Sequence, residues 1–92
     1  MKTITLQIGN SDNKLTQIEW SDFVADIAWL LEQEPTTHIH FFGGPQNWES
    51  WQNVAWVFVT NNAMRLCEEV KRIRTKYRQD SAAWTEGTTV FV

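Results

Sequence analysis

The order of apolar patterns along the chain predicts an α+β fold of the ferredoxin-like kind, β-α-β-β-α-β, in which two helices cover one face of a single antiparallel sheet. Short segments with every second residue apolar alternate with two longer segments whose apolar residues recur every three or four positions. The chain has 92 residues, enough for one core and too few for two. We therefore expect a single domain over residues 1–92.

The first strand and the first helix have clear signals. Thr3 to Ile8 alternates strictly between apolar and polar residues, which is typical of a half-buried strand. Thr16 and Glu19 have the spacing of a capping box, so the helix should start there and continue to about Gln33, before Pro35. Its sheet-facing stripe is expected to contain Trp20, Phe23, Val24, Ile27, Leu30 and Leu31.

The opposite side of this helix also carries apolar residues. Ile18, Ala25 and Trp29 lie at spacings of seven and four, roughly 180° from the core stripe. No sheet would lie beneath a Trp at that position. Trp29 and Ile18 are therefore predicted to be exposed and to bind a partner, because Trp is enriched at interface hot spots.

Two strands are expected in the middle of the chain. Thr37 to Phe42 should place Ile39 and Phe41 on one face and His38, His40 and Phe42 on the other. The next strand, Gln52 to Thr60, is apolar on both faces, so its pattern does not decide which face meets the helices. The loop between them, from Gly43, carries Trp48 and ends at Trp51, and both are further candidates for partner binding.

The remaining elements are a second helix and a final strand. Asn61 or Asn62 should cap the helix, whose core face is expected to contain Ala63, Leu66, Cys67, Val70, Ile73 and Tyr77. Cys67 would then be a buried and unreactive thiol. Residues 82–92 are expected to form one strand, or two short strands around a turn at Glu86 and Gly87.

Charge and composition exclude several classes of function. A net charge of −3 argues against general binding to nucleic acid, which needs an excess of Lys and Arg. One cysteine cannot form an internal disulfide, and no segment is apolar enough for a signal peptide or a membrane span. These observations predict a cytoplasmic protein.

No motif points to catalysis or to a cofactor. His38 and His40 could supply two metal ligands, but no third ligand can be placed, so we expect two exposed histidines and no metal. Gly43 and Gly44 lack the rest of a phosphate-binding fingerprint. The carboxylates are expected to be solvated, so the sequence does not by itself define an activity.

The sheet face away from the helices is predicted to be aromatic, with His40, Phe42 and Phe91 on it. RNA stacking, pairing with a second copy and docking of another protein are the uses considered. RNA stacking is disfavoured, since the first strand presents only Thr3, Thr5 and Gln7 to that face.

The C-terminal stretch YRQDSAAWTEGT, Tyr77 to Thr88, resembles the ending of small uncharacterised proteins carried by bacteriophages and other mobile elements of bacteria. The resemblance contains no site motif and transfers no catalytic or binding residue. It implies a protein partner in the bacterial host, in a setting that includes inhibitors of bacterial defence such as anti-CRISPR proteins.

Two functions are therefore predicted. The first is a small protein-interaction module, not an enzyme, that inhibits a bacterial defence system or another host enzyme by steric occlusion. Its candidate contact residues are Trp29, Ile18, Trp48, Trp51, Phe42 and His40. The second is a homodimeric small-molecule-binding protein or enzyme, in which two facing sheets enclose a pocket lined by His38, His40 and the aromatic residues of the open sheet face. Nucleic-acid binding by the basic face of the second helix is a weaker alternative, because of the net charge.

Overall fold

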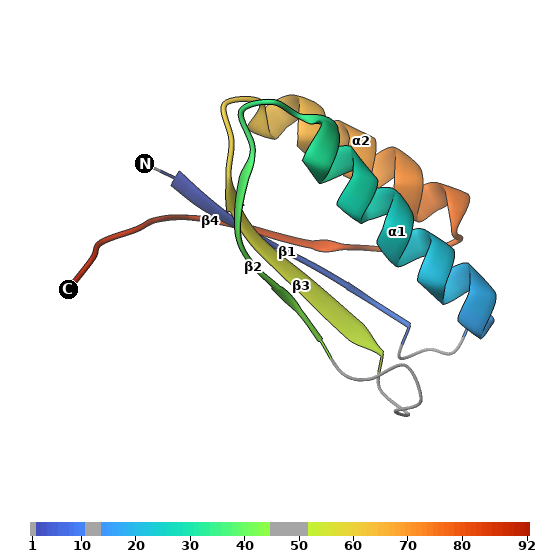
Figure 1. Cartoon of the computed structure of the whole chain (residues 1–92). Helices are drawn as coiled ribbons and strands as arrows, with labels where there is room; N and C mark the ends of the chain where they lie inside the picture. The colour runs from blue at the N-terminus through green and yellow to red at the C-terminus, as the bar shows by residue number, and fades with distance from the viewer. Residues whose placement is uncertain (1, 11–13, 45–51) are drawn as a thin grey trace.

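The computed structural model describes residues 2–10, 14–44 and 52–92. Its elements follow in the order β1 (Lys2–Gly9), α1 (Gln17–Gln33), β2 (His38–Gly43), β3 (Asn53–Val59), α2 (Ala63–Lys76) and β4 (Ala83–Thr88). The strands form one sheet in the order β2-β3-β1-β4, and every neighbouring pair is antiparallel. Both helices lie on the same face of that sheet (Figure 1). The predicted ferredoxin-like α+β fold is confirmed.

The core lies between the two helices and the central strands. Alternation along β1 from Ile4 onward and along β3 sends every second side chain toward the helices, where each is at most 8% exposed. Val54, Trp56 and Phe58 face the core, so they form the face of β3 that meets the helices. The helices contribute the buried residues Trp20, Phe23, Ile27, Leu30, Leu31, Leu66, Val70 and Ile73, with Val24 partly buried beside them.

The start of α1 is fixed by the predicted capping box. Thr16 Oγ1 accepts a hydrogen bond from the Glu19 amide at 3.1 Å, and the Glu19 carboxylate accepts one from the Thr16 amide at 3.1 Å. These bonds satisfy two backbone donors that have no partner within the helix. The helix ends at Gln33, and Glu34 is extended, as expected for a residue ahead of Pro35.

Glu34 joins the end of α1 to the start of α2. Its carboxylate is almost fully buried and accepts hydrogen bonds from the Thr36 amide and hydroxyl, from Asn62 Nδ2 and from Arg65. The hydrogen bond from Arg65, at 2.7 Å, and those from Thr36 and Asn62 lower the pKa of Glu34 to about 2. Asn62 is the residue that caps α2, but its side chain binds Glu34 and makes no capping hydrogen bond to the helix.

Tyr77, directly after α2, joins that end of α2 to the middle of α1 through Asp26. The Tyr77 ring stacks on Phe23 with centroids 5.0 Å apart, and its hydroxyl donates to Asp26 at 2.6 Å. Burial, together with that hydrogen bond, raises the pKa of Tyr77. Lys76 Nζ lies 3.2 Å from the same carboxylate. Arg78 follows in the left-handed region (φ 60°) and ends α2, donating its amide hydrogen to the Thr75 carbonyl.

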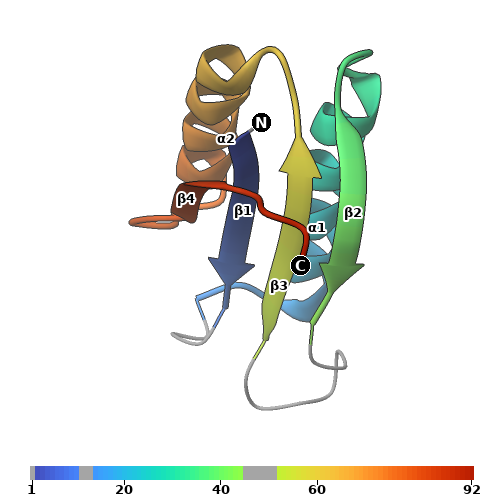
Figure 2. The same ribbon diagram turned by 90° about the vertical axis from the view of Figure 1, so that its left-hand side faces the viewer.

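One prediction about the C-terminal half is wrong, and another is decided between its two alternatives. Cys67 is half-buried rather than fully buried. Residues 83–88 form one strand, in which Gly87 pairs with Thr3, so no turn divides it at Glu86 and Gly87. Residues 89–92 follow as an extended segment outside the strand. Figure 2 shows this segment crossing in front of β1 and β3.

Candidate functional site

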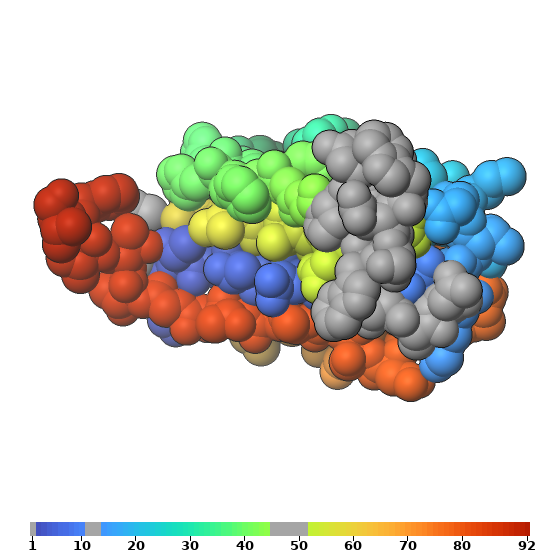
Figure 3. All heavy atoms as spheres, turned by 90° about the horizontal axis from the view of Figure 1, so that it is seen from below, coloured from blue at the N-terminus to red at the C-terminus, as the bar shows by residue number. Residues whose placement is uncertain are grey.

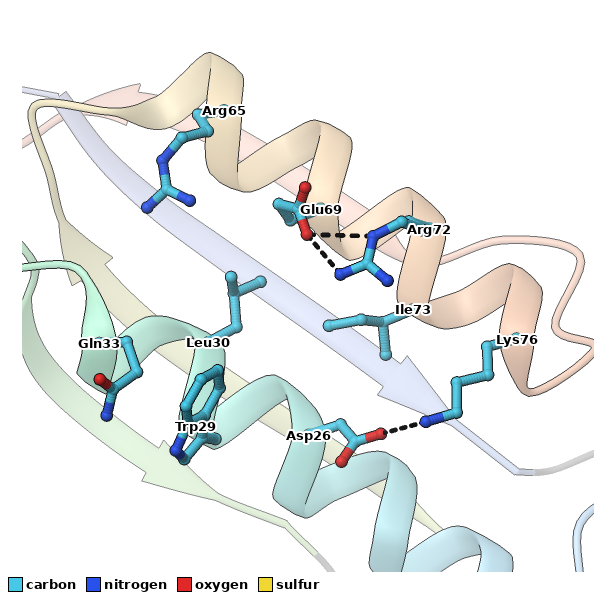
Figure 4. Close-up of a pocket in the computed structure, with 9 residues that line it drawn as sticks. All are labelled: Asp26, Trp29, Leu30, Gln33, Arg65, Glu69, Arg72, Ile73 and Lys76. Atoms are coloured by element: carbon cyan, nitrogen blue, oxygen red, sulfur yellow. Dashed lines mark hydrogen bonds and ion pairs between the residues drawn. The ribbon is translucent and has the colours of Figure 1, made fainter.

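The outer surface of the helix pair contains a groove between α1 and α2, which we call the Trp29 groove (Figure 4). Its volume is about 490 Å³. It is lined from α1 by Asp26, Trp29, Leu30 and Gln33, and from α2 by Arg65, Glu69, Arg72, Ile73 and Lys76.

The apolar part of the Trp29 groove combines buried and exposed side chains. Leu30 and Ile73 are 8% and 7% exposed and belong to the edge of the core. Trp29 is 64% exposed and stands beside them on the surface of α1. A large aromatic side chain is thus presented to solvent on a helix that is itself anchored by its buried face.

The polar rim of the groove consists of ion pairs. Arg72 donates two hydrogen bonds to Glu69, at 3.1 and 2.5 Å, and Lys76 Nζ lies 3.2 Å from the Asp26 carboxylate (Figure 4). Arg65 is held by the buried Glu34. Each cation of the rim therefore has a carboxylate partner.

Ile18 is exposed as predicted but lies apart from the groove. It is 76% exposed on the same side of α1 as Trp29. The two residues are eleven positions apart, about 16 Å along a helix. The structure therefore does not bring them into one pocket.

A second recess lies on the sheet face away from the helices, the face that Figure 3 presents to the viewer. We call it the sheet-face hollow. Its volume is about 630 Å³, and three strands and the C-terminal segment enclose it. Its lining residues are Thr3, His38, His40, Val57, Val59, Thr89 and Phe91. The predicted grouping of His38, His40 and Phe91 on the open face is thus seen, although Phe91 follows β4 instead of lying in it.

The predicted position of Phe42 on the open sheet face is wrong. The pairing of β2 with β3 shifts between Ile39 and Phe41, and the extra residue is His40. Beyond this bulge Phe42 pairs with Trp56, and their rings lie 5.2 Å apart on the helix side of the sheet. Phe41 pairs with Val57 and takes the open face instead. Strict alternation could not reveal this, because the bulge inserts one residue into the period of two.

The other predicted features are located as follows. Trp48 and Trp51 lie outside the described residues. Within the described part of the chain, no group of three or more His, Cys, Asp and Glu side chains could hold a metal ion. No helix among residues 2–10, 14–44 and 52–92 is long and apolar enough to cross a membrane.

No protein-family model matches the chain, and no curated protein is similar to it. Solved structures do share its fold. SnoaB from Streptomyces nogalater, a cofactor-independent oxygenase solved as a mutant, is 12% identical with a TM-score of 0.59, over 99% of this chain and 93% of SnoaB. Formyltetrahydrofolate deformylase from Burkholderia mallei is 17% identical with a TM-score of 0.55, over 94% of this chain. This chain spans only 27% of the deformylase. At such identities the similarity shows the fold alone.

Proposed function

We propose that this protein is a small protein-binding module that docks its partner in the Trp29 groove. The observation that carries the proposal is a Trp side chain, 64% exposed, beside the buried core residues Leu30 and Ile73. Trp is among the residues most enriched at binding hot spots, where it fills an apolar pocket on the partner. The ion-paired rim would surround such a contact with polar groups, as the rims of protein interfaces do.

The partner is a protein of a bacterial host, and binding inhibits it by steric occlusion. The resemblance of residues 77–88 to small proteins of bacteriophages and mobile elements supports this setting, in which an anti-CRISPR or a similar anti-defence role is the leading hypothesis. A rigid helix pair suits occlusion, since a preorganised surface loses little conformational entropy on binding.

The test is affinity capture from a bacterial lysate with three forms of the tagged protein: wild type, Trp29→Ala and Met64→Ala. Met64 is the matched control, because it is 86% exposed on α2 and does not line the groove. We expect one stoichiometric protein with the wild type and with Met64→Ala, and its loss with Trp29→Ala. With purified partner, Trp29→Ala should cost about 2 kcal/mol or more of binding free energy.

The proposal fails if the captured protein binds all three forms equally, or if only Met64→Ala loses it. A partner that remains bound to Trp29→Ala would place the interface elsewhere on the molecule. A competition assay with the host enzyme's own substrate would then separate occlusion from binding at a distant surface.

The second hypothesis, a homodimer that encloses a small molecule, stays a prediction. The sheet-face hollow supports the small-molecule site of this hypothesis, because the hollow lies on the face where two copies would meet. Light scattering distinguishes the two hypotheses, since a strict monomer rules out a shared pocket.

A further inference from the structure

The sheet-face hollow has an apolar floor and one aromatic wall. Val57 and Val59 of β3 form the floor, and Phe91 of the C-terminal segment lines one side, with its side chain 87% exposed. The hydroxyls of Thr3 and Thr89 hydrogen-bond to each other and tie that segment to β1. A volume of about 630 Å³ is within the range of about 300–1,000 Å³ that is usual for small-molecule sites.

Two imidazoles supply the polar groups of the hollow that are free to bind a ligand. His38 and His40 both line it, and neither imidazole makes a hydrogen bond or an ion pair with any other residue that the structure describes. Two positions along a strand correspond to about 6–7 Å, so both side chains can reach one small group placed between them. Every imidazole has at least one N–H donor.

The charges around the hollow favour an anion. The chain has 11 Asp and Glu residues and a net charge of −3, yet none of the described residues that line the hollow is acidic. His38 and His40 are the ionisable side chains among those lining residues, and they become positive when protonated. An anionic group would therefore meet hydrogen-bond donors and no carboxylate side chain among the residues that line the hollow.

We propose that the sheet-face hollow binds an apolar carboxylate. The aromatic or aliphatic body of the ligand lies against Val57, Val59 and Phe91, and its carboxylate accepts hydrogen bonds from His38 and His40. This site is separate from the proposed docking function, because the hollow and the Trp29 groove lie on opposite sides of the sheet.

The test uses 2-naphthoate as the probe and naphthalene-2-carboxamide as its neutral match. Two-dimensional ¹H–¹⁵N spectra of the full chain are recorded during titration with each compound. We expect saturable shifts at the amides of Thr3, His38 to Phe41, Val57 to Val59 and Thr89 to Phe91. The carboxylate should bind roughly tenfold more tightly than the carboxamide, since hydrogen bonds to a charged acceptor are about twice as strong as neutral ones.

Variants assign the roles of the lining residues. Replacing both histidines, His38→Gln with His40→Gln, should remove the preference for the carboxylate and leave weak binding of both compounds. Phe91→Ala should weaken both compounds alike, and Trp29→Ala should bind as the wild type does. The same spectra report whether each variant is folded.

Three outcomes would overturn the proposal. The first is equal affinity for the carboxylate and the carboxamide. The second is a set of shifts confined to residues of the Trp29 groove. The third is that the same amides shift on dilution of the protein alone, which would mean that a second copy occupies this face.

Discussion

At the scale of single residues, two Trp side chains on the same helix have different environments. Trp20 is 2% exposed and contacts Phe23 edge to face, whereas Trp29 is 64% exposed. Nine positions separate them, which turns the side chains to opposite faces of a helix with 3.6 residues per turn. Trp56 is buried and Trp84 is partly buried against the core. Among the Trp residues that the structure describes, Trp29 is the one that does not pack in or against the core.

The two residues should therefore respond differently to truncation. Trp20→Ala should lower the free energy of unfolding by about 3–5 kcal/mol, because it removes a buried aromatic side chain. Trp29→Ala should change it by less than about 1 kcal/mol. Urea denaturation followed by circular dichroism measures both. A large loss for Trp29→Ala would show that Trp29 stabilises the fold and is not reserved for a partner.

Glu34 predicts how stability depends on pH. Hydrogen bonds from Arg65, Thr36 and Asn62 lower its pKa in the folded protein from 4.5 to about 2. The contribution of the Glu34 carboxylate to the free energy of unfolding should therefore be fully present above about pH 5 and disappear as the pH falls toward 2. Glu34→Gln should destabilise the protein at pH 7, and its difference from the wild type should shrink across that window.

Glu32→Gln is the matched control, since Glu32 is an exposed residue of α1. Denaturation series at pH 7, 5, 3.5 and 2.5 give the comparison. A difference between wild type and Glu34→Gln that stays constant from pH 7 to pH 2.5 would contradict the assigned role of the carboxylate.

At the scale of elements, β2 shows how one inserted residue redirects a strand. It is an edge strand, and its side chains from His38 to Phe42 are all exposed. The bulge at His40 keeps both histidines in the sheet-face hollow and moves Phe42 to the helix side, beside Trp56. The hollow and the aromatic contact both depend on that shift.

Phe41 and Phe42 provide a direct test of the bulge. Both side chains are 54% exposed, but only Phe42 contacts the buried ring of Trp56 among the aromatic pairs of the described residues. Phe42→Ala should therefore cost about 0.5–1.5 kcal/mol more stability than Phe41→Ala. Thermal unfolding of both variants measures the difference. Strict alternation along β2 predicts the reverse order, so that result would argue against the bulge.

At the scale of the whole molecule, the sheet separates two surfaces with different chemistry. The helix side carries a groove with an exposed Trp and an ion-paired rim, and the open side carries a hollow with two imidazoles. The core is formed by the helices with the strands of the sheet, and residues 89–92 lie outside it. The C-terminal segment therefore lines the sheet-face hollow and contributes no side chain to the core.

Ending the chain after Thr88 should distinguish a contribution of residues 89–92 to stability from their contribution to ligand binding. The truncated protein should lose less than about 1 kcal/mol of stability, because the removed side chains are mostly exposed. It should bind 2-naphthoate several-fold more weakly, since Phe91 and Thr89 line the hollow. Denaturation and the same spectral titration measure both properties. Unchanged affinity would show that the segment does not form a wall of the site.

The sequence alone determined the element order, the capping box and the outward position of Trp29, because each depends on local spacing along the chain. The core face of β3 was decided only by tertiary structure, since both of its faces are apolar. The bulge at His40 depends on pairing with β3, and the lining of the hollow joins Thr3 to Thr89 and Phe91 from the other end of the chain. Such contacts come from strand register and chain path, which no local pattern encodes.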